Sequence, residues 1–60
     1  MRYRVSWPRT DRKERRYAYK TSLPHALGLA EKLRAEGKKR VRIDAQEVDY
    51  GEWNDISDAL

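Results

Sequence analysis

Polar and apolar residues alternate in three short segments of this 60-residue chain, at residues 2–7, 14–21 and 39–45. A period of two is typical of β-strands that bury one face. The first two segments are joined by a polar connection at residues 8–13, so we expect them to form an antiparallel hairpin. The side chains expected to face the core from these strands are Tyr3, Val5, Trp7, Tyr17, Tyr19, Val41 and Ile43.

Between the second and third segments the apolar period changes to that of a helix. Leucine and alanine recur at spacings of three and four from Leu23 to Leu33, which predicts one apolar helical stripe. Ser22 is placed to cap the start, Pro24 suits the first turn, and Gly37 suits the end. The expected core residues of the helix are Leu23, Ala26, Leu27, Ala30 and Leu33.

These segments predict a small α+β domain of order β-β-α-β, with one helix packed on a three-stranded, mostly antiparallel sheet. We favour the strand order second–first–third; a right-handed crossover between parallel neighbours is the alternative. Residues 1–50 would form this single domain. Residues 51–60 would form a short amphipathic C-terminal helix or an acidic tail that docks through Trp53, Ile56 and Leu60, which are spaced three and four apart.

The composition excludes several classes of site. The chain has no Cys and one His, so we expect no disulfide, no metal and no cofactor. No serine has a neighbouring His, and we therefore expect no enzyme activity. No apolar run is long enough for a membrane span or a secretory signal, so a cytoplasmic protein is expected. Because a chain of this length forms only a small core, a homodimer is an alternative source of stability.

The charges are segregated along the chain. All 14 Lys and Arg lie within residues 1–42, whereas residues 43–60 contain six acids and no base. This asymmetry is typical of a nucleic-acid-binding body with an acidic tail. If the helix covers the aromatic face, the other sheet face is rich in cations, and the hairpin loop adds more. The predicted nucleic-acid contacts are Arg2, Arg4, Arg9, Arg12, Lys13, Arg16, Lys20, Arg40 and Arg42. The alternative is that these charges only solvate an open sheet face.

Two strands and the helix carry a resemblance to known DNA-binding modules. The segments are Tyr3-Arg4-Val5-Ser6-Trp7, Arg15-Arg16-Tyr17-Ala18-Tyr19-Lys20-Thr21 and residues 23–36. They resemble the arm-site-binding domains of tyrosine integrases and the plant AP2 domain, which read DNA with a three-stranded sheet backed by one helix. The resemblance implies DNA as the partner. It departs from those families because here the helix precedes the third strand. Size and composition also resemble small accessory proteins of bacteriophages and mobile elements.

The acidic segment allows a second function. It could fold over the basic face and compete with nucleic acid, pair with a second subunit, or only solvate the chain. Alternatively, the protein binds a host or partner protein through a sheet edge or through Trp53, Ile56 and Leu60. Trp53 could instead close the end of the core. An RNA-cleaving toxin that uses Tyr, Arg and Lys side chains is a third, enzymatic alternative.

Overall fold

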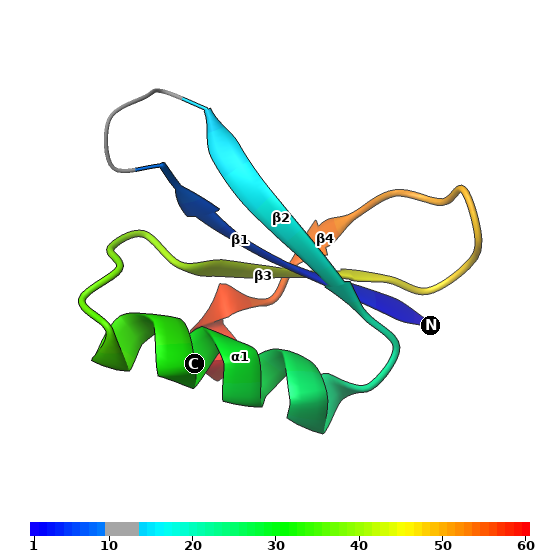
Figure 1. Ribbon diagram of the computed structural model, residues 1–60. Coiled ribbons are helices and arrows are strands. Elements are labelled where there is room, and N and C mark those ends of the chain that lie inside the picture. The colour runs from blue at the N-terminus through cyan, green and yellow to red at the C-terminus, as the bar shows by residue number, and fades with distance from the viewer. Residues whose placement is uncertain (10–13) are drawn as a thin grey trace.

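A computed structural model describes residues 1–9 and 14–60 of the chain (Figure 1). The elements are β1 (Arg2–Pro8), β2 (Arg15–Lys20), α1 (Leu23–Ala35), β3 (Arg42–Gln46), β4 (Asn54–Asp55) and a 3-10 turn, η1 (Ser57–Ala59). The predicted α+β class is confirmed, since one helix lies across one face of an antiparallel sheet. No helix among the described residues is long and apolar enough to cross a membrane.

The sheet has four strands in the order β2-β1-β3-β4, and every neighbouring pair is antiparallel. The predicted order of the first three strands is therefore confirmed. The prediction of three strands is wrong because the C-terminal segment adds a fourth. β4 pairs with β3 through Asp55 opposite Asp44 and Asn54 opposite Ala45.

Of the two alternatives for residues 51–60, the amphipathic α-helix is wrong. The segment forms the two-residue strand β4 and the three-residue 3-10 helix η1 instead. The Ile56 amide donates to the Ile43 carbonyl at 2.9 Å, and the Ile43 amide donates to Ser57 Oγ at 3.1 Å. Ile56 and Leu60 also pack against the core. The segment forms strand and turn because these bonds pair the outer edge of β3, whose backbone groups would otherwise lack protein partners.

The core lies between α1 and the two central strands. Val5, Ile43, Ala26 and Ala30 are fully buried there, and seven partly buried apolar side chains pack around the cluster. The helix ends as its sequence predicts: Gly37 has φ +88°, its amide donates to the Arg34 carbonyl, and the Lys38 amide donates to the Leu33 carbonyl. This is a Schellman motif, in which Gly takes the left-handed position. Ser22 holds the N-cap position, but its side chain makes no capping hydrogen bond.

Two residues predicted for the core, Tyr17 and Tyr19, are instead on the surface, with 50% and 54% of their area exposed. The pairing of β1 with β2 explains the difference. Val5 is opposite Ala18, and residues directly opposite in a sheet project from the same face. The helix-facing side of β2 therefore carries Arg16, Ala18 and Lys20, and its two tyrosines project from the other face.

Candidate functional site

The sheet face opposite α1, here called the open face, carries aromatic and arginine side chains from three parts of the chain. Arg4 of β1 is paired with Tyr19 of β2, and Ser6 is paired with Tyr17. Trp53 directly precedes β4, and its ring lies against Tyr19. We call Arg2, Arg4, Tyr17, Tyr19 and Trp53 the aromatic–arginine face.

These five side chains are connected by a series of pairwise contacts. The guanidinium carbon of Arg4 lies 4.4 Å from the Trp53 ring centroid and 5.2 Å from that of Tyr17. That of Arg2 lies 5.4 Å from the Tyr19 centroid and 6.0 Å from the Trp53 centroid. The Tyr19 and Trp53 centroids are 6.0 Å apart, with the rings tilted by 54°. All four guanidinium distances lie within the range of cation–π attraction, so each arginine links Trp53 to one tyrosine.

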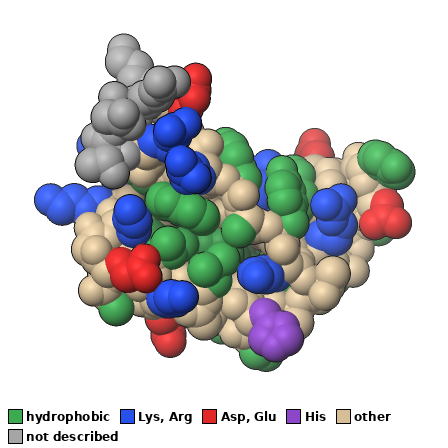
Figure 2. All heavy atoms as spheres, viewed as in Figure 1, with side chains coloured by type: hydrophobic (Ala, Val, Ile, Leu, Met, Phe, Trp, Pro, Cys, Tyr) green, Lys and Arg blue, Asp and Glu red, His purple; other side chains and the backbone are tan. Residues whose placement is uncertain are grey.

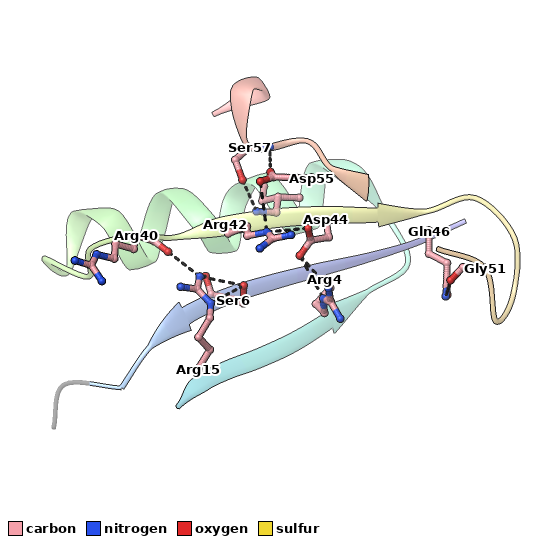
Figure 3. A network of polar contacts seen from close by, with 11 residues as sticks. Arg4, Ser6, Arg15, Arg40, Arg42, Asp44, Gln46, Gly51, Asp55 and Ser57 are labelled. Carbon is pink, nitrogen blue, oxygen red and sulfur yellow. Dashed lines mark hydrogen bonds and ion pairs between the residues drawn. The ribbon is translucent and has the colours of Figure 1, made fainter. Parts of the chain in front are cut away.

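A buried carboxylate fixes Arg4 of β1 and Arg42 of β3. Asp44 has a side chain only 1% exposed, and it accepts from Arg4 at 3.3 Å and from Arg42 Nε at 2.9 Å (Figure 3). Arg42 Nε also lies 3.4 Å from Asp55 Oδ2. A buried carboxylate needs partners of this kind. The two aspartates therefore neutralise much of the charge on the β3–β4 half, and the open face is less cationic than the sequence predicts.

Asp55 is held ionised by its own turn. The side chain and the backbone amide of Ser57 donate to it, and these bonds, with the nearby Arg42 charge, hold the pKa of Asp55 below its ordinary value. Asp55 is exposed, so its charge also reaches solvent. It thus remains a negative group at the β4 edge of the open face.

Arg15 is a site residue that the sequence analysis missed. Its Nη2 donates to the Ser6 carbonyl at 3.0 Å, to Ser6 Oγ at 3.1 Å and to the Arg40 carbonyl at 2.8 Å (Figure 3). These bonds join β2, β1 and the bend before β3, where Arg40 has φ +57°. Within β2, Arg15 has the same alternation as Tyr17 and Tyr19, which is the signal that places it on this face.

The predicted cationic residues do not form one surface. Arg2, Arg4 and Arg42 lie on the open face, whereas Arg16 and Lys20 project from the helix side of β2. The strand register explains why the cations lie on two faces, because a shift of one residue exchanges the two faces of a strand.

The other predicted cations lie elsewhere. Arg40 is in the bend before β3, and Arg12 and Lys13 lie outside the described residues. Arg9 lines a hollow at the C-terminal end of α1, together with Trp7, Pro8, Arg16, Leu33, Glu36 and Lys38. Figure 2 shows this side of the molecule, with hydrophobic side chains gathered near its centre and Lys and Arg around them. Positive charge near the C-terminal end of a helix is favourable for its dipole.

Trp53, Ile56 and Leu60 do not form a common surface. Trp53 contacts the open face, whereas Ile56 and Leu60 pack against the helix-side core. Sequence analysis also missed two exposed apolar residues in the acidic loop between β3 and β4, Val48 and the fully exposed Tyr50.

No cluster of potential metal ligands occurs among the residues that the structure describes. Comparison with known proteins finds no matching family model, no matching curated protein and no matching solved structure.

Proposed function

We propose that this protein binds nucleic acid, with DNA as the first candidate, through the aromatic–arginine face of its sheet. The observation that carries the proposal is the interleaving of Arg2 and Arg4 with three aromatic rings, on the sheet face opposite α1. Arginine side chains bind phosphates and aromatic rings stack on bases. The proposal assigns binding, and no chemical step, to this chain.

The distribution of charge supports the same proposal. The net charge is +4, and every Lys and Arg lies before residue 43. Such a charge attracts polyanions and makes their binding weaken steeply as salt rises. The acidic C-terminal segment would modulate binding by a specific contact: Asp55 and Asp44 engage Arg42 and so withhold one cation from a ligand.

The proposal is tested by fluorescence anisotropy with labelled single- and double-stranded oligonucleotides across a range of salt concentrations. Arg2→Ala is the informative variant because Arg2 is exposed and pairs with no carboxylate among the described residues. We expect weaker binding and a salt slope reduced by about one. Arg34→Ala removes the same charge from the exposed side of α1 and is the matched control. If a folded protein binds neither form at low salt, or if both variants bind as the wild type does, the proposal fails.

A second candidate function is binding of a partner protein. The observation that favours it is the acidic loop between β3 and β4, in which Tyr50 is fully exposed and Val48 is largely exposed. Exposed apolar side chains of this kind are common in protein interfaces. Tyr50→Asn separates the two candidates, since Asn tolerates the positive φ of this residue. It should leave nucleic-acid affinity unchanged and weaken only binding of a protein to this loop.

A further inference from the structure

We propose that the ligand of the aromatic–arginine face is an unpaired nucleic-acid strand, with two of its bases stacked on Tyr17 and Tyr19. This inference rests on the proposed function and narrows it to one class of ligand.

About half of each tyrosine is exposed to solvent. The two residues are two apart on β2, and side chains at this spacing project from the same face about 7 Å from each other. Exposed aromatic rings in a row provide flat apolar surfaces, which bases of any identity can cover. In a duplex the base faces are already stacked on one another, whereas an unpaired strand presents them freely. The tyrosines therefore match an unpaired strand better than a duplex.

The tyrosine rings are supported by neighbouring side chains before any ligand arrives. Trp53 packs against Tyr19 and lies directly over the Arg4 guanidinium, which in turn lies against Tyr17. Arg4 is itself held by the buried Asp44. A surface that is ordered in advance loses less conformational entropy on binding. The arrangement is therefore a pre-formed stacking platform.

The carboxylates indicate where the strand runs. Asp44 and Asp55 lie on the β3–β4 half of the open face and engage Arg42 there. Phosphates would be repelled from that half. On the other half, Arg2 and Arg15 have no carboxylate within ion-pair distance among the described residues. The strand is therefore expected to follow β1 and β2, with its bases on the tyrosines and its phosphates near these arginines.

The test compares four labelled probes by anisotropy: oligothymidine, the same strand made abasic, its duplex with oligodeoxyadenosine, and oligouridine. The abasic strand retains the phosphates but has nothing to stack. We expect an unpaired strand with bases to bind more tightly than both the abasic strand and the duplex. Whichever of oligothymidine and oligouridine binds more tightly, the inference is supported equally. The comparison then identifies the sugar that the site prefers.

The variants separate stacking from charge. Tyr17→Leu and Tyr19→Leu keep an apolar side chain but remove the ring, and each should weaken binding of the unpaired strand about five-fold or more. Tyr17→Phe and Tyr19→Phe keep the ring and should bind as the wild type does. Tyr50→Asn removes an exposed tyrosine elsewhere and is the control. Circular dichroism of every variant establishes that it is folded.

The possible failures are distinguishable. If the duplex or the abasic strand binds as tightly as the unpaired strand, and the leucine variants bind normally, the stacking inference is overturned while the proposed function stands. If the folded wild-type protein binds none of the four probes, both are overturned.

Discussion

Asp44→Asn is the substitution whose effect on stability follows most directly from the structure. The Asp44 side chain is 1% exposed. It accepts hydrogen bonds from Arg4 on the neighbouring strand β1 and from Arg42 on its own strand β3. Asparagine has nearly the same shape but no charge, and one of its two terminal atoms donates rather than accepts. The substitution therefore weakens both contacts without leaving a cavity.

The size of the effect can be bounded from the exposure of the partners. Breaking a buried ion pair costs about 3–5 kcal/mol when the remaining charge stays buried. Here the Arg4 side chain is 21% exposed and that of Arg42 is 46% exposed, so both can turn toward water. We expect the loss to approach that of a charge-assisted hydrogen bond, about 2 kcal/mol. For a domain of this size that lowers Tm by about 8–16 °C.

The assay is thermal and urea unfolding followed by circular dichroism at neutral pH. Asp58→Asn is the matched control, because it makes the same change in net charge at an exposed position of η1. We expect the control to retain the wild-type Tm within a few degrees. If Asp44→Asn and Asp58→Asn unfold at the same temperature, the assignment of Asp44 as the carboxylate that holds the open face is refuted.

Three further predictions concern the helix and the C-terminal turn. Gly37→Ala should destabilise the protein by about 1 kcal/mol, because Gly37 has φ +88°. Gly28→Ala should stabilise it by about 0.5–1 kcal/mol, since the added methyl group meets open space within α1. Urea unfolding measures both changes in the free energy of unfolding. Two changes in the same direction would contradict these predictions. Folding lowers the pKa of Asp55 below its ordinary value of 3.8. Its carboxylate therefore stabilises the folded protein at pH values above 3.8, and this stabilisation is lost as the pH falls through the lowered pKa. The Tm difference between wild type and Asp55→Asn should therefore shrink in acid, and a difference that grows there would contradict this prediction.

The exposed position of Tyr17 and Tyr19 shows what alternation along a strand can and cannot predict. The period of two correctly places β2 and groups the tyrosines on one face. It does not say which face the helix covers, because that depends on how β2 pairs with β1. The general preference of aromatic residues for the core favours the wrong face here. The pairing of Val5 with the small Ala18 settles the question.

The contacts that organise the open face also cannot be predicted from the local sequence pattern. Arg4 and Asp44 are 40 residues apart in the chain, and the strand β4 that brings Asp55 to Arg42 is only two residues long. A two-residue strand has no readable period. The helix, by contrast, follows from a local apolar stripe and a terminal glycine, and these signals predict its position.

These contacts show that the arginines of the open face are not equally available to a ligand. In the sequence, Arg2 and Arg42 are equivalent members of a cationic set. In the structure, Arg42 lies between Asp44 and Asp55, whereas Arg2 contacts only rings among the groups described. An arginine committed to two carboxylates contributes to the fold, and an arginine stacked on exposed rings remains available to a phosphate. Arg42→Ala should therefore lower Tm more than Arg2→Ala does. Arg2→Ala should lower the affinity for nucleic acid more than Arg42→Ala does. Unfolding and anisotropy are measured on the same two variants, and equal losses of affinity would show that net charge alone, and not the arrangement of the open face, governs binding.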